Sequence, residues 1–197
     1  GRKAHYLAKW NGSTWDSLAS DLNPDYSPDN IMVGLTTSAF RGADIYVAGI
    51  FPRFGGWQHV AKSNGTTWTD LGAVNYPAIV TVLAVDGGTL YAGGEFDSIG
   101  GVHARRIARW NGTGWDSLGS GVTGAYPAVS AIAVNGGDVY AGGNFDSAGG
   151  LPVYNIARWN GTGWYPLGSG VSGSNHRVTA LAVSGTDLYA GGSMDTA

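Results

Sequence analysis

One nine-residue segment occurs four times in this chain of 197 residues. The copies at 107–115 and 156–164 are identical (IARWNGTGW), and related copies read LAKWNGSTW at 7–15 and VAKSNGTTW at 60–68. The Asn of this segment recurs at spacings of 53, 47 and 49 residues. Short strands that repeat about every 40–50 residues are typical of β-propeller blades, so the repeat strongly constrains the fold.

A second repeated segment reads IYVAGIF at 45–51, LYAGGEF at 90–96, VYAGGNF at 139–145 and LYAGGSM at 188–194. One full period contains four short strand-like stretches, at 129–134, 139–143, 155–159 and 164–167. The Asn-Gly pair between the last two favours a type I′ hairpin turn, which needs positive φ at both central residues. Each period therefore predicts a four-stranded blade.

The two ends of the sequence contain complementary halves of one repeat. Residues 5–18 match strands three and four of a blade, and residues 178–194 match strands one and two. A lone two-stranded hairpin is marginally stable, so each half needs a partner. We predict an all-β, four-bladed propeller in a single domain, 1–197, with blade 1 at 29–72, blade 2 at 79–119, blade 3 at 128–168 and a composite blade 4 from 178–197 and 5–19.

The same match fits closure within one chain and closure between chains equally well. In the second case the C-terminal hairpin of one copy receives the N-terminal hairpin of the next, which produces larger rings or filaments. A third interpretation is that the sequence is a piece of a longer array.

Conserved features within the repeats have structural interpretations. The second Trp of the nine-residue segment is expected to pack between blades, and the small residues of AGG suit the crowded inner strands. The Asp that follows AGG is expected to cap a turn rather than to hold a metal ion. These residues are Trp15, Trp68, Trp115 and Trp164, and Asp97, Asp146 and Asp195.

Composition argues against several classes of function. The chain has no Cys, a net charge of −3 and no run of Lys or Arg, which disfavours disulfides, thiol chemistry and nucleic-acid binding. No apolar run approaches the ~18 residues of a membrane span, so membrane insertion is not expected. Because no two of the four His have a usual ligand spacing, we expect no metal and no cofactor.

The repeat resembles two known families. LYAGGEF followed by IARWNGTGW is similar to the Kelch-type propeller repeat, in which a strand ends in Gly-Gly and a Trp follows across a hairpin. It is still more similar to the Gly-rich WNG-x-x-W-x-x-LGSG repeats of bacterial secreted and cell-surface proteins. These resemblances imply a propeller fold and a secreted or cell-surface location. The copper chemistry of the Kelch-type galactose oxidase needs a Cys-crosslinked Tyr, which this chain lacks.

The long connections between strands are the candidate ligand site. Tight turns such as NGGD and NGTG are expected on one rim of the ring, which places the long connections together on the other. That rim is rich in aromatic residues and His, and Trp57 has no counterpart in the other repeats. The candidate ligand-binding residues are Tyr26, Trp57, His59, Tyr76, His103, Tyr126, Tyr154 and His176. The alternative is structural, because Tyr-Pro pairs also stiffen crossings and cover the edge of a core.

Two functions of different classes follow. The first is a non-enzymatic, extracellular or cell-surface module for binding or adhesion, with carbohydrate or protein as ligand. The second is a structural protein that assembles with itself through its half-blades. We identify no nucleophile with a nearby base and no catalytic carboxylate pair, so we do not expect an enzyme. The sequence also contains four N-glycosylation sequons, at Asn11, Asn64, Asn111 and Asn160, although the turns alone explain these residues.

Overall fold

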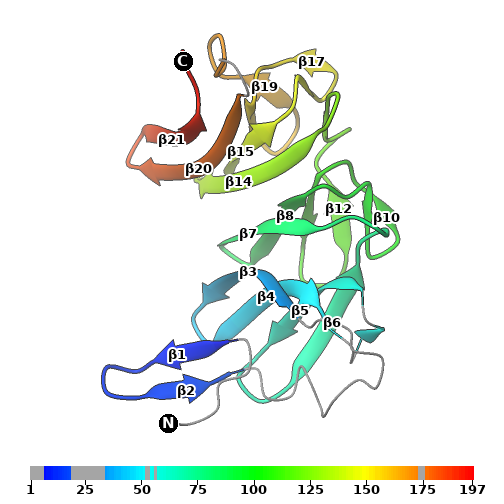
Figure 1. The fold of residues 1–197 in the computed structure, drawn as a ribbon, viewed down its shortest axis with the longest axis vertical. Coiled ribbons are helices and arrows are strands. Elements are labelled where there is room, and N and C mark those ends of the chain that lie inside the picture. Colours follow the sequence, from blue (N-terminus) through cyan, green and yellow to red (C-terminus); the bar gives the residue numbers. More distant parts are fainter. Residues whose placement is uncertain (1–6, 19–33, 52–53, 56, 173–175) are drawn as a thin grey trace.

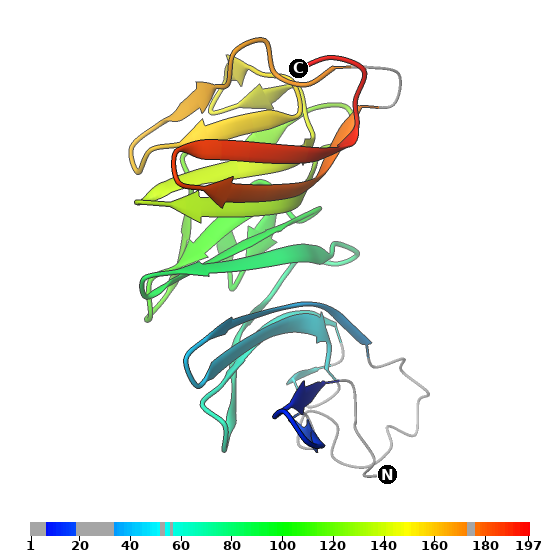
Figure 2. The ribbon, with the colours of Figure 1, turned by 90° about the vertical axis from the view of Figure 1, so that its left-hand side faces the viewer.

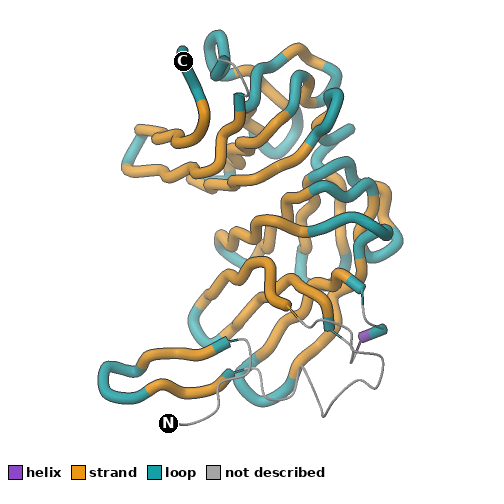
Figure 3. Tube along the Cα trace, viewed as in Figure 1, coloured by secondary structure: helices purple, strands orange, loops and turns teal. Residues whose placement is uncertain are grey.

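The structure is a computed structural model that describes residues 7–18, 34–51, 54–55, 57–172 and 176–197. Its regular structure in the described part is mainly antiparallel β-sheet (Figure 3). Three sheets have four strands each, which confirms the predicted all-β class and the four-stranded unit.

The three sheets follow one another along the chain (Figure 1). The first sheet contains β3 (Gly34–Arg41), β4 (Asp44–Ile50), β5 (Gln58–Ser63) and β6 (Trp68–Ala73). The second contains β7 (Val80–Asp86), β8 (Thr89–Gly94), β11 (Ile107–Trp110) and β12 (Trp115–Ser117). The third contains β14 (Ala128–Asn135), β15 (Asp138–Asn144), β18 (Ile156–Trp159) and β19 (Trp164–Pro166). In each sheet the strands are paired in chain order.

Two hairpins flank these sheets. The N-terminal hairpin pairs β1 (Ala8–Trp10) with β2 (Trp15–Ser17), and the C-terminal hairpin pairs β20 (Arg177–Ser184) with β21 (Asp187–Ser193). They lie at opposite ends of the molecule in both ribbon views (Figures 1 and 2). They form separate sheets in this structure, so the composite fourth blade and the blade boundaries stay predictions.

Very short strands occupy the long connections. β9 (Ser98–Ile99) pairs with β10 (Val102–His103), and β16 (Ser147–Ala148) pairs with both β13 (Val122–Thr123) and β17 (Leu151–Pro152). The sequence pattern predicts loops at these segments. The β13–β16 pairing ties the long connection of the third sheet to the crossing that precedes this sheet, so backbone hydrogen bonds hold that connection in place.

The turn of the repeated segment differs from the predicted type. Trp110 pairs with Trp115, which leaves a loop of four residues, and φ is not positive at Asn111. Instead, the Asn111 Oδ1 accepts hydrogen bonds from the backbone N–H groups of Thr113 (2.9 Å) and Gly114 (3.0 Å). The predicted type I′ geometry was therefore wrong here, because the Asn side chain closes the loop. Gly136 and Gly137, between β14 and β15, do have positive φ at both central positions.

Two of the repeated Trp residues connect neighbouring sheets by hydrogen bonds. The Trp115 Nε1 donates to the Leu71 carbonyl of the first sheet at 2.6 Å, and the Trp164 Nε1 donates to the Leu118 carbonyl after the second at 2.7 Å. Both indoles are buried, as is Trp68, which confirms the predicted packing between sheets. Trp15 differs, since it is 61% exposed.

Glycines of the AGG segment allow the close approach of the next sheet. A Cβ built on Gly93 of β8 would lie 2.6 Å from Val129 Cγ1 of β14. A Cβ on Gly142 of β15 would lie 2.5 Å from Val178 Cγ1 of β20. The first strands β3, β7, β14 and β20 accordingly pack one against the next.

Candidate ligand-binding site

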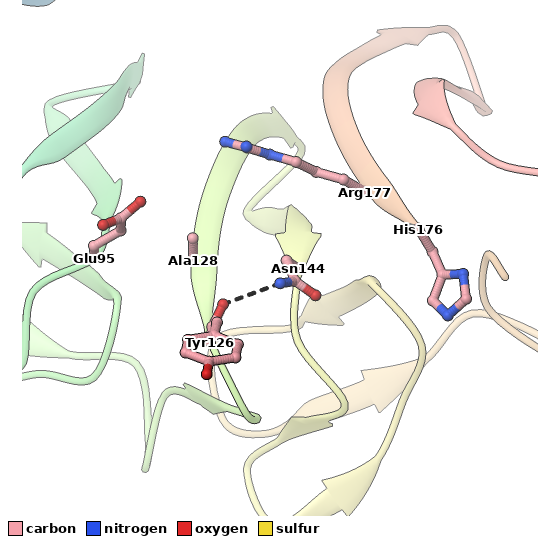
Figure 4. A pocket seen from close by; sticks show the side chains of 6 residues that line it. All are labelled: Glu95, Tyr126, Ala128, Asn144, His176 and Arg177. Atoms are coloured by element: carbon pink, nitrogen blue, oxygen red, sulfur yellow. Dashed lines mark hydrogen bonds between the residues drawn. The ribbon is translucent and has the colours of Figure 1, made fainter. Parts of the chain in front are cut away.

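A cavity of about 550 Å³ lies at one end of the first strands, where the long connections meet. Figure 2 shows the turns of the first hairpins on the opposite side (left), which agrees with the predicted separation of tight turns from long connections. The cavity is lined by Glu95, Tyr126, Ala128, Asn144, His176 and Arg177 (Figure 4). These residues come from the second sheet, the third sheet and the C-terminal hairpin.

Regular strands position the polar groups of this cavity. Ala128 and Arg177 begin β14 and β20, Asn144 ends β15, and Glu95 directly follows β8. Because first and second strands are paired, these four residues occupy equivalent places on neighbouring sheets. Asn144 pairs with Ala128, and the Glu95 N–H donates to the Ile79 carbonyl at 2.9 Å.

Hydrogen bonds orient two of the lining side chains. The Asn144 Nδ2 donates to the Tyr126 carbonyl at 3.1 Å (Figure 4). The Arg177 Nε and Nη2 donate to the Ser130 Oγ at 3.1 and 2.9 Å, so the guanidinium extends from β20 toward β14. The Glu95 carboxylate lies on the second-sheet side of the cavity, and the Arg177 guanidinium points in its direction in Figure 4. The lining therefore offers an anion, a cation and an amide around one opening.

A second hollow of about 360 Å³ adjoins the first and shares Tyr126, Asn144 and His176 with it. Tyr154 also lines this hollow. Tyr126 is 86% exposed, and Tyr154 and His176 are exposed as well. The structure thus brings together three predicted site residues, Tyr126, Tyr154 and His176, which are far apart in the sequence.

Asn155 holds the backbone next to Tyr154. It is buried and has φ of 62°, a left-handed conformation that is unusual for a residue other than Gly. Its Oδ1 accepts the Phe145 N–H at 3.2 Å, and its Nδ2 donates to the Val171 carbonyl at 2.9 Å. Asn155 therefore fixes the loop that presents the Tyr154 ring.

Trp57 and Tyr76 form a separate aromatic surface. Their ring centroids lie 4.4 Å apart, and both rings are exposed. They line a hollow of about 130 Å³ with residues that include Ile50 and Ile79. Ile50 and Ile79 occupy the places of Asn144 and Ala128 in their sheets, so this surface lies at the corresponding ends of the strands.

The other predicted residues are placed differently. His59 is buried, and its Nδ1 lies 3.0 Å from the Asp70 Oδ1. His103 is exposed on β10 and lines neither Tyr126 hollow. Tyr26 lies outside the described residues. His59 is therefore packed within the first sheet, and His103 lies apart from Tyr126, Tyr154 and His176.

Sequence reasoning missed Glu95, Asn144 and Arg177. A signal for the first two was present, because the position after AGG varies among the repeats while its neighbours are nearly constant. That position holds Ile50, Glu95, Asn144 and Ser193. A variable position at the end of an otherwise constant strand indicates a surface that the fold does not constrain.

One of the predicted turn-capping Asp residues has a different role in the structure. Asp97 contacts the Arg106 guanidinium, so its carboxylate forms an ion pair across the loop. Among the described residues, no group of three or more His, Cys, Asp or Glu is arranged to hold a metal ion. No helix in this described part is long and apolar enough to cross a membrane.

No protein-family model matches the chain, and no curated protein sequence matches it.

Proposed function

We propose that this protein is a non-enzymatic binding or adhesion module that acts outside the cell or at the cell surface. Its ligand is a carbohydrate, which binds at the cavity of Tyr126, Tyr154 and His176. The observation that carries this proposal is the gathering of exposed rings from separate connections beside Glu95, Asn144 and Arg177.

The chemistry of the lining favours a sugar over an apolar small molecule. Tyr rings offer apolar faces on which a sugar ring stacks, and their hydroxyls and the nearby amide and charged groups bond to sugar hydroxyls. The first hollow has one Glu and one Arg in its lining, Glu95 and Arg177, and the second has one Asp, Asp146. A protein ligand is the alternative, and the binding experiment separates the two.

We also propose that the sheets are blades of a β-propeller related to the Kelch-type and WNG-x-x-W repeats, with the two terminal hairpins as halves of a fourth blade. Support comes from the recurrence of one strand order in three sheets. It also comes from the same Trp-to-carbonyl bond between successive sheets.

A glycan array followed by calorimetric titration of the best sugar tests the binding function. The variants Tyr126→Ala and Tyr154→Ala are each expected to weaken binding roughly two- to tenfold, since stacking on an aromatic ring contributes about 0.5–1.5 kcal/mol. Tyr165→Ala is the matched control, because Tyr165 is an exposed Tyr on β19 that lines neither hollow. Binding of peptides but not sugars would replace the carbohydrate ligand with a protein. No binding to either class would reject the function.

A further inference from the structure

One edge of each terminal hairpin has no paired strand among the described residues. In the second and third sheets, the second strand pairs on both sides: β8 with β7 and β11, and β15 with β14 and β18. Within the described residues, β21 of the C-terminal hairpin pairs with β20 alone, and β1 of the N-terminal hairpin pairs with β2 alone. Free edges of this kind are templates for another strand.

The hairpins also expose side chains whose counterparts are buried. Trp15 is 61% exposed, whereas Trp115 is 5% exposed. Tyr189 is 59% exposed, whereas Tyr91, at the same place of the second sheet, is 8% exposed. At the equivalent places, the first sheet covers Trp115 and a hydrophobic cluster surrounds Tyr91, so the two hairpins present apolar surface that lacks such a cover.

The register of the complete sheets predicts how the hairpins fit. In the third sheet, Val139 pairs with Trp159, Tyr140 with Arg158 and Ala141 with Ala157. The second sheet has the same register, in which Leu90 pairs with Trp110 and Tyr91 with Arg109. Applied to the hairpins, this register places Leu188 opposite Trp10, Tyr189 opposite Lys9 and Ala190 opposite Ala8.

Charges on the hairpins match this register. In the first sheet, the Lys62 Nζ lies 2.8 Å from the Asp44 Oδ2 and 5.4 Å from the centre of the Tyr46 ring. In the third sheet, the Arg158 Nε lies 3.1 Å from the Asp138 Oδ2. Lys9 and Asp187 occupy the corresponding positions of the two hairpins, so pairing brings Lys9 to Asp187 and over the Tyr189 ring.

A further contact surface lies on the C-terminal hairpin. Gly93 and Gly142 are each covered by Val side chains of the following first strand, but a Cβ on Gly191 would meet only the Ala180 Cβ, at 3.7 Å. In the order β3, β7, β14 and β20, the strand expected after β20 is β3 of the next copy. Leu35 of β3 corresponds to Val129 and Val178, so it has the position that would cover Gly191.

Both hairpins are already packed on their own neighbours. Leu7 and Leu18 pack against the buried cluster that contains Trp68, and Val178 packs on Gly142. The hairpins then lie at opposite ends of the molecule (Figures 1 and 2). Pairing between copies would therefore leave each hairpin on its present neighbour.

We propose that the 197-residue chain associates head to tail, with β1 of one copy pairing with β21 of another. The joined sheet has the order β20-β21-β1-β2, and the Trp15 Nε1 of one copy donates to the Leu167 carbonyl of the other, as Trp164 does to Leu118. Such an interface is heterologous, so it closes into a ring or grows into a filament. The proposal rests on the blade assignment above but not on ligand binding.

Disulfide trapping tests the pairing directly, because the chain contains no Cys. The single variants Lys9→Cys and Tyr189→Cys are mixed and oxidised mildly, and a covalent dimer of twice the 20.3 kDa chain is expected on a non-reducing gel. Lys9→Cys mixed with Ala190→Cys is the register control. Ala190 faces the other side of β21, so this mixture is expected to give little dimer. Circular dichroism confirms that each variant folds.

The double variant Lys9→Cys/Tyr189→Cys identifies the source of the partner strand. Covalent dimers and larger species support association between copies. A disulfide-bonded monomer as the sole product overturns it in favour of closure within one chain. Absence of any disulfide in both experiments overturns the complementarity of the hairpins as well, while sugar binding is unaffected by all three results.

Charge reversal gives an independent measurement on chains without Cys. Light scattering over a concentration series is expected to show masses above 20.3 kDa for the native sequence. Lys9→Glu and Asp187→Lys are each expected to weaken association about tenfold, and the double reversal to restore it. Asp86→Lys, at the exposed β7–β8 turn, is the matched control and is expected to have no effect. A mass of one chain at every concentration overturns the proposal.

Discussion

Tyr91 and Tyr189 occupy the same repeat position but differ in burial. Tyr91 is buried in the second sheet, and desolvation raises its pKa above the ordinary value of 10.0. Asp86 raises this pKa further and Arg109 opposes it. Tyr189 is exposed on the C-terminal hairpin. The same residue type therefore lies in two environments within a single chain.

Tyr91→Phe is expected to reduce the loss of stability at alkaline pH. Because the folded-state pKa of Tyr91 is raised, its contribution is fully present below the unfolded value of 10.0 and is lost as pH rises through the folded pKa. The hydrogen bond to Asp44 raises the pKa of Lys62. Lys62 therefore adds a loss of stability of the same sign in the native protein and in the Tyr91→Phe variant. Urea unfolding at neutral pH and above pH 10 measures the difference. Tyr189→Phe is the control, and an equal effect of both changes would contradict the role of burial.

At the residue scale, the sequence predicted the packing of Trp68, Trp115 and Trp164, because a bulky side chain that recurs in every repeat is most simply explained by contacts between repeats. It also predicted Tyr126, Tyr154 and His176 as surface residues of the long connections. It did not separate His59 from these, since only the fold reveals that the His59 ring meets Asp70 inside the first sheet.

At the scale of single elements, the connection before β18 depends on Asn155. Asn155→Ala is expected to lower the free energy of unfolding by about 2–4 kcal/mol, because two buried hydrogen bonds are lost and the left-handed backbone is strained. Asn155→Gly loses the same hydrogen bonds without the strain, so its loss is expected to be about 1 kcal/mol smaller. Chemical denaturation measures both. Equal losses would show that the backbone conformation adds nothing.

The main strands followed from the repeat, whereas the short strands inside the connections did not. Strands β9 and β10 flank Gly100 and Gly101, and β16 pairs with β13 from the preceding crossing. Pairs of only two residues have no detectable alternation of apolar and polar side chains, so the sequence pattern cannot find them. The Asn111 turn was missed for a related reason, because the Asn-Gly pair suits two loop geometries and the position of its Trp pair decides between them.

At the scale of the whole molecule, the similarity between repeats predicts each sheet. It does not predict which strands complete the two terminal hairpins. Trp10 and Lys9 match the third-strand pattern wherever they pair, so the sequence alone fits closure within one chain and between chains. The structure adds the placement of the two hairpins at opposite ends. It also shows which glycine faces are covered by a following strand and which are open.

The glycine faces provide a test of this asymmetry. Gly142→Ala is expected to destabilise the single chain by about 1–3 kcal/mol, because its Cβ would lie 2.5 Å from Val178 Cγ1. Gly191→Ala is expected to leave dilute protein unchanged or stabilise it by up to about 1 kcal/mol, since its Cβ is in ordinary contact with Ala180 alone. In the head-to-tail assembly the same methyl group would displace the incoming strand, so association is expected to weaken. Denaturation at low concentration measures the first effect, and light scattering measures the second. If Gly191→Ala associates like the native chain, the open face of the C-terminal hairpin is not the contact between copies.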